Sequence, residues 1–149
     1  MEYTELPLLG WREWLSLPGI NVPGIKAKVD TGARSSCLHT HDFTIFEKEG
    51  REYVRFHLHP IPGNSVELTC EAPVLEFREV KDSGGHAEQR PFIRTLAKVG
   101  DIEWEIDLSL SNREGMKFRM LLGRQAVAGK FYVDPGSSYL IGKKLKDEY

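Results

Sequence analysis

The sequence has few cysteines, no long apolar run and no excess of one charge sign. Two cysteines, Cys37 and Cys70, are too few for a disulfide framework and are not spaced as paired metal thiolates. We expect both to be buried, reduced thiols. No stretch approaches the roughly 20 apolar residues that cross a bilayer, and residues 1–9 lack the features of a secretory signal. These absences predict a cytoplasmic protein with no membrane association.

The charge balance also excludes broad electrostatic recognition. Twenty basic residues oppose 22 acidic residues, for a formal net charge of −2. Such a chain has no global positive field to attract nucleic acid or an anionic membrane. Any recognition by charge must therefore be local. With 149 residues the chain can bury one core, so we expect a single domain over residues 1–149.

Short apolar runs, broken by glycine, proline, asparagine and aspartate, predict a mostly β protein. Alternation is clearest where Ile25, Ala27 and Val29 are separated by lysines, as in a half-buried strand. One short helix is predicted from Arg124 to Ala128, before Gly129. The charged C-terminal residues 143–149 are expected to fray. The strands are predicted at 25–29, 53–59, 66–70, 74–80, 91–99, 102–110 and 118–122, with turns at 60–64 and 82–85.

The alternating strand runs directly into Asp30-Thr31-Gly32-Ala33, and Met120-Leu121-Leu122-Gly123-Arg124 follows far downstream. An isolated Asp-Thr-Gly triplet also suits an ordinary strand-to-loop turn, so its flanks decide its meaning. With these flanks the sequence resembles the retropepsin family of aspartic peptidases. Arg34, Leu38-His39, Arg90-Pro91 and Asn112-Arg113 extend the likeness to a bacterial branch called ATP-dependent zinc proteases. The resemblance covers nearly the whole chain.

The resemblance implies a closed acid-protease barrel whose active site combines two subunits. Asp30 would be a catalytic carboxylate, Thr31 would hydrogen-bond across the pair, and Gly32 would let backbone approach it. Two adjacent carboxylates share one proton, so one can activate water while the other protonates the substrate. This chemistry requires no metal and no cofactor. Because the chain offers one such loop, the resemblance implies a homodimer.

A second triplet, Asp82-Ser83-Gly84, is a poor candidate for the other half of the pair. Gly85-His86 follows it instead of a small residue that leads into a strand, and the residues before it are polar. We expect a hairpin tip there. The segment from about Arg78 to Pro91 is predicted to be a flap that closes over substrate.

Retroviral members of the family usually carry an aspartate where this chain has Arg34, so Arg34 and Arg124 cannot form the corresponding ion pair. We expect Ala33, Arg34, Arg90 and Arg119 to bind substrate, with the arginines joined by Arg113 in a local basic cleft. The bacterial branch is linked to ATP-grasp glutamate ligases, which implies a peptide or protein substrate rich in glutamate. Each arginine alone could equally be an ordinary solvated side chain.

Two other functions remain open on the sequence. A non-catalytic peptide-binding module could keep the same cleft. A zinc-dependent hydrolase could use His57, His59 and a carboxylate, although such pairs along a strand are weak evidence. No glycine-rich phosphate loop is visible, so we expect no ATP dependence. The three tryptophans are expected to fill the core or a dimer interface.

Overall fold

The computed structural model describes residues 5–81, 84–113 and 115–149, and it is mostly β with one short α-helix. This composition confirms the prediction of a mostly β chain with one short helix. The elements are β1 (Leu8–Gly10), β2 (Arg12–Leu17), η1 (Pro18–Ile20), β3 (Val22–Asp30), β4 (Ser36–His39), β5 (Asp42–Lys48), β6 (Arg51–Leu58), β7 (Leu68–Pro73), β8 (Glu76–Lys81), β9 (Ala87–Val99), β10 (Ile102–Ser111), β11 (Met120–Gly123), α1 (Arg124–Val127), β12 (Tyr132–Asp134) and η2 (Lys146–Glu148).

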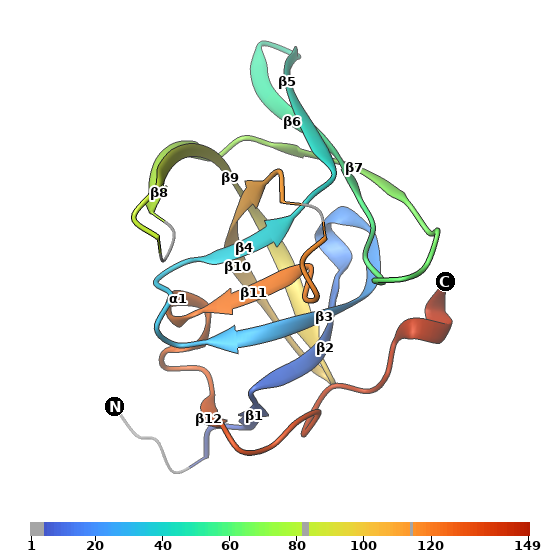
Figure 1. Ribbon diagram of the computed structural model, residues 1–149, viewed down its shortest axis with the longest axis vertical. Helices are drawn as coiled ribbons and strands as arrows, with labels where there is room; N and C mark the ends of the chain where they lie inside the picture. The colour runs from blue at the N-terminus through green and yellow to red at the C-terminus, as the bar shows by residue number, and fades with distance from the viewer. Residues whose placement is uncertain (1–4, 82–83, 114) are drawn as a thin grey trace.

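The main sheet has the strand order β10-β4-β11-β3-β2-β9-β8, and β9 also pairs with β10 (Figure 1). This last pairing joins six strands into a closed ring, while β8 extends from β9 as the second arm of a hairpin. The ring is mixed, because β11 runs parallel to β3 and β10 runs parallel to β4. Strands β5, β6 and β7 form a separate antiparallel sheet, and β1 pairs with β12.

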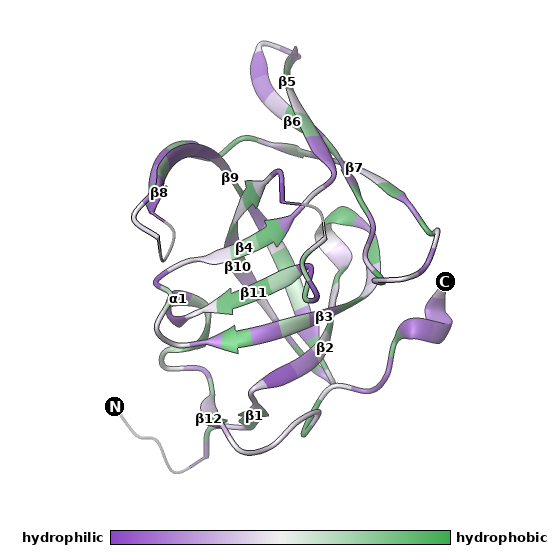
Figure 2. Cartoon of the chain, viewed as in Figure 1, coloured by the Kyte–Doolittle hydropathy of each residue, from purple (hydrophilic) through white to green (hydrophobic). Residues whose placement is uncertain are grey.

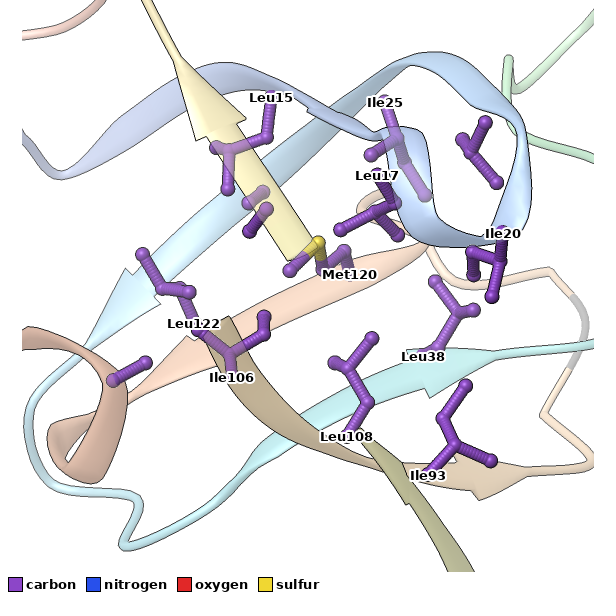
Figure 3. Close-up of a cluster of buried hydrophobic side chains, with 14 of the residues drawn as sticks. Leu15, Leu17, Ile20, Ile25, Leu38, Ile93, Ile106, Leu108, Met120 and Leu122 are labelled. Atoms are coloured by element: carbon purple, nitrogen blue, oxygen red, sulfur yellow. The ribbon is translucent and has the colours of Figure 1, made fainter. Parts of the chain in front are cut away.

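The core lies inside this ring. Alternate residues of β3 point inward, so Ile25 and Ala27 are fully buried while Lys28 between Ala27 and Val29 is exposed. Figure 3 shows apolar side chains from different strands meeting in one cluster. They include Leu15, Leu38, Ile93, Leu108 and Met120, all fully buried.

The predicted strands correspond to β3 and β6 to β11, with boundaries that differ by a few residues. The two predicted turns lie where antiparallel strands reverse, between β6 and β7 and between β8 and β9. The Asn64 amide donates to the Ile61 carbonyl in the first turn, at 3.2 Å. Residues 82 and 83, and with them most of the Asp82-Ser83-Gly84 triplet, lie outside the described residues.

The prediction that residues 143–149 fray is wrong. Three residues of this segment, Lys146–Glu148, form η2, and the Tyr149 hydroxyl exchanges hydrogen bonds with the backbone of Gly24 at 2.5 and 3.1 Å. Both cysteines are free thiols and buried, as expected. Over the described ranges, no helix is both long and apolar enough to cross a membrane.

Candidate active site

Asp30 is the last residue of β3, at the point where the strand leaves the sheet, and its side chain is half-buried. The loop folds back on this carboxylate. Its Oδ1 atom accepts hydrogen bonds from the backbone N–H groups of Gly32 at 2.9 Å and Ala33 at 3.3 Å. Within the described part of the chain, Oδ2 accepts none. The loop therefore orients the carboxylate through one oxygen and leaves the other available for chemistry.

Strand β11 supports this loop, as the sequence predicts. It lies between β3 and β4, with Gly123 opposite Asp30. The Gly123 N–H donates to Ser36 Oγ at 3.0 Å, and a Cβ added at Gly123 would lie 2.4 Å from the Ser35 carbonyl oxygen. Only glycine lets the strand pass this close to the loop.

The start of α1 fastens the other side of the loop. The Arg124 N–H donates to the Ala33 carbonyl at 2.7 Å, and the next amide donates to the Arg34 carbonyl at 3.0 Å. The Arg124 guanidinium reaches the Thr31 carbonyl at 3.0 Å. Arg124 therefore holds the loop within the subunit, and Thr31 and Gly32 remain exposed.

A cleft of about 1030 Å³ opens over Asp30, between the loop, β4 and the hairpin of β8 and β9. The predicted flap is this hairpin. Residues 78–81 of β8 and Arg90 of β9 line the cleft, and Figure 2 shows that β8 is largely hydrophilic. The structure thus brings the flap candidate to the cleft that holds Asp30, while its closure stays a prediction.

The lining of the cleft is basic although the chain is acidic overall. Of the residues predicted to bind substrate, Ala33, Arg34 and Arg90 line it, together with Arg113. Arg90 is the most deeply placed, at 7% exposure, and its guanidinium donates to the Cys37 sulfur at 3.5 Å. The lining carries five Lys and Arg residues against two carboxylates, and its full set is Asp30, Gly32, Ala33, Arg34, Ser35, Cys37, His39, Arg78, Glu79, Val80, Lys81, Arg90, Phe92, Ser109, Arg113, Met116, Leu121 and Gln125.

Arg119 lies elsewhere. It is not among the described residues that line the cleft, and its guanidinium donates instead to the backbone carbonyls of His59 at 3.0 Å and Met116 at 2.5 Å. This arginine therefore ties the end of the β6 strand to the segment before β11. Its geometry is that of a structural cross-link.

Sequence reasoning missed two cleft residues of β4. Cys37 and His39 share the face of β4 that lines the cleft, and His39 Nδ1 lies 3.3 Å from Ser111 Oγ. Burial, followed by the positive charges of Arg90, Arg113 and Arg119, lowers the pKa of His39 to about 4. Burial raises the pKa of the Cys37 thiol. Cys37 and His39 are two residues apart on a strand, so their side chains point to the same face. This spacing, shortly after the Asp-Thr-Gly loop, was the signal available in the sequence.

The histidines of the zinc alternative form separate pairs. His57 Nδ1 lies 2.6 Å from an Asp42 carboxylate oxygen, and His59 Nε2 lies 2.9 Å from Glu67. Within residues 5–81, 84–113 and 115–149, no group of three or more His, Cys, Asp or Glu residues could hold a metal ion. The described residues thus provide no ligand set for that alternative.

Comparisons with known proteins find relatives that match most of this chain. A probable alpha-L-glutamate ligase from Shewanella pealeana is 42% identical over 138 residues, which are 92% of this chain and 30% of the ligase. A second probable alpha-L-glutamate ligase, from Parasynechococcus marenigrum, is 41% identical over 146 residues, which are 97% of this chain and 31% of that ligase. This chain therefore spans less than a third of these curated relatives.

Among solved structures, protein Lpg0085 of Legionella pneumophila, of unknown function, matches with a TM-score of 0.74 and 30% identity, covering 90% of this chain and 97% of that one. The model of the family described as RimB-like, retropepsin-like aspartic endopeptidase RimB, matches residues 8–144. Because this match spans almost the whole sequence, the chain belongs to the RimB-like family of retropepsin-like aspartic endopeptidases.

Proposed function

We propose that this chain is one subunit of a homodimeric aspartic peptidase that hydrolyses peptide or glutamyl amide bonds. The observation that carries the proposal is the position of Asp30. Its half-buried carboxylate lies in a large cleft, is oriented through Oδ1 by its own loop, and keeps Oδ2 unbonded among the described residues. A carboxylate held in this way is organised for proton transfer.

The chemistry requires a second carboxylate, and a two-fold axis would supply Asp30 of a second copy. Two carboxylates in contact share one proton. The ionised one takes a proton from water as its oxygen attacks the carbonyl carbon, while the other gives its proton to the carbonyl oxygen. In the second step the C–N bond breaks, the departing nitrogen receives the proton that was taken from water, and the carboxylate that protonated the carbonyl oxygen takes a proton back from that hydroxyl. The exposed loop residues Thr31 and Gly32 would face the partner loop.

Two observations favour a glutamate-rich substrate. The cleft concentrates cationic side chains around Asp30, and the planar guanidinium group of the exposed Arg34 can pair with a carboxylate through two hydrogen bonds. The curated relatives carry a ligase name, and a segment like this chain makes up about 30% of their length. One polypeptide that both adds and removes glutamate would use a shared acidic substrate, so we include glutamate tails in the proposal.

The test is hydrolysis of a peptide with a glutamate tail by the wild type and by Asp30→Asn. We expect the substitution to lower kcat by at least about a thousandfold, because an amide cannot accept the proton from water. A chelator should leave the wild-type rate unchanged. Chelator-sensitive cleavage that survives Asp30→Asn would contradict the proposal, and tight peptide binding without any cleavage would support a binding module instead.

A further inference from the structure

A second cavity, of about 560 Å³, opens beside β2 and β3. Five cationic side chains line it, and none of its lining residues is acidic. These five are Arg12, Lys26, Lys117, Lys144 and Lys146. They come from β2, from β3, from the segment before β11 and from the C-terminal segment, so residues far apart in sequence build one basic site in an acidic chain.

The rest of the lining is aromatic and apolar. The Lys26 ammonium lies 5.4 Å from the Trp14 ring centroid and 5.9 Å from that of Tyr139. The Arg12 guanidinium stacks over Tyr139 at 5.1 Å. For the described residues, no carboxylate lies within 4 Å of any of the four lysines. Two of the five cations, Lys26 and Arg12, thus lie against aromatic rings, and the four lysines have no neutralising carboxylate among the described residues. This arrangement favours an anionic ligand.

The outer face of β3 connects this cavity to Asp30. Lys26, Lys28 and Asp30 lie on that face, since the residues between them are buried. On the neighbouring strands, Arg12 and Leu121 both lie opposite Lys28, and Leu121 lines the cleft. Lys26 precedes Asp30 by four positions along the strand, which correspond to about 13 Å. An extended peptide covers the same distance with about four residues.

We propose that this cavity, defined by the five cations above, is an exosite that binds the acidic segment of the polypeptide substrate about four residues away from the bond at Asp30. The inference rests on the proposed function, which supplies the acidic substrate. Successive carboxylates of an extended chain would meet Lys28 on the way and then the cavity. Substrates with longer acidic segments would therefore bind more tightly than short ones.

The test compares two triple variants with the same charge change. Lys117→Gln, Lys144→Gln and Lys146→Gln alter the cavity, whereas Lys98→Gln, Lys130→Gln and Lys143→Gln alter lysines outside it; all six side chains are exposed. Both triples are made in the Asp30→Asn background, which prevents cleavage. Fluorescence anisotropy then measures the Kd of labelled peptides of four and ten glutamates at fixed salt.

We expect the cavity triple to raise the Kd of the ten-glutamate peptide about tenfold, because it removes three lysine contacts and each contributes a factor of about two or slightly more. The control triple should change it by less than about twofold, and the four-glutamate peptide should respond little to either. Equal losses in both triples, or equal losses for both peptides, would overturn the inference. So would tighter binding of a ten-nucleotide RNA that is lost in the cavity triple.

A second measurement separates this inference from the proposed function. It follows hydrolysis of the ten-glutamate peptide by the same two triple variants with the native Asp30 in place. If the enzyme cleaves the ten-glutamate peptide but both triples lower kcat/KM equally, the exosite fails and the peptidase stands. If the peptide binds with the expected difference between triples and is never cleaved, the peptidase fails while the cavity remains an acidic-peptide site.

Discussion

Two carboxylates on adjacent antiparallel strands have opposite surroundings. Glu13 of β2 is fully buried and accepts four backbone hydrogen bonds, from Gly10 at 2.7 Å, Leu140 at 2.8 Å, Ile141 at 3.2 Å and Gly142 at 2.9 Å. Asp30 of β3 is half-buried and accepts two, both from its own loop and both on one oxygen. Strands β2 and β3 pair directly, so the two environments are neighbours in one sheet.

The comparison separates a structural carboxylate, Glu13, from Asp30, for which we propose a catalytic role. Both oxygens of Glu13 are used, and three of its four partners, residues 140–142, fasten the C-terminal part of the chain to β2 across more than 120 residues of sequence. Asp30 keeps one oxygen unbonded among the described residues and faces a large cleft. Removing the first should therefore cost stability, whereas neutralising the second should cost only activity.

The largest effect is expected for Glu13→Ala. It leaves four backbone N–H groups without their acceptor, two of them in buried hydrogen bonds and two in part-buried ones, so we expect the free energy of unfolding to fall by about 3–5 kcal/mol. Asp30→Asn should change it by less than about 1 kcal/mol, because the amide oxygen still accepts both loop hydrogen bonds. Urea unfolding measures both variants. Exposed Glu103→Ala is the control, and a similar loss there would remove the contrast.

Gly123→Ala tests the support of Asp30 by β11. Its Cβ would lie 2.4 Å from the Ser35 carbonyl oxygen, so either the strand or the loop must shift. We expect a loss of about 1–3 kcal/mol in the free energy of unfolding, together with reduced turnover. Gly136→Ala is the matched control, because a Cβ at that position would lie 3.5 Å from its nearest atom, Asp134 Oδ1, which is an ordinary van der Waals distance. Unchanged stability in Gly123→Ala would contradict the close approach.

The smallest effect concerns pH and His39. Its pKa is about 4 in the folded chain and about 6.5 when unfolded, so between these values the unfolded state binds more protons. Stability from this residue is therefore complete above pH 6.5 and is lost as the pH falls toward 4. After screening by solvent, we expect His39 to account for a loss on the order of 1 kcal/mol in the free energy of unfolding over this pH range. Chemical unfolding of wild type and His39→Asn at pH 7 and 5 measures it, and identical pH dependence would contradict this account.

Local patterns were sufficient to predict the strand that ends at Asp30 and the strand that supports it. Alternation in β3, the Asp-Thr-Gly triplet and the glycine of β11 located Asp30 and its support, because each depends on a few adjacent residues. Strand β2 went unrecognised since four of its six residues are buried, which hides any alternation. The hydrogen bond that holds residues 143–149 could not be predicted because Gly24, the partner of Tyr149, lies far away in sequence.

The arginines show the same limit. Arg34, Arg90 and Arg113 were predicted to gather in a basic cleft, and they do. Arg119 has equal charge and lies near the same motif, yet it bonds to two backbone carbonyls. Charge and proximity in sequence do not tell which way a side chain points, so only the packed structure separates a cleft residue from a cross-link.

The central claim is that two Asp30 carboxylates act as one pair, and a mixing experiment tests it most directly. Wild type and Asp30→Asn are unfolded together, refolded at varied ratios, and assayed on a glutamate-tailed peptide at constant total protein. If the pair is shared across a dimer, activity follows the square of the wild-type fraction, so an equal mixture keeps about one quarter. Activity that falls in direct proportion, with about one half remaining, would show that each subunit works alone and would contradict the shared pair.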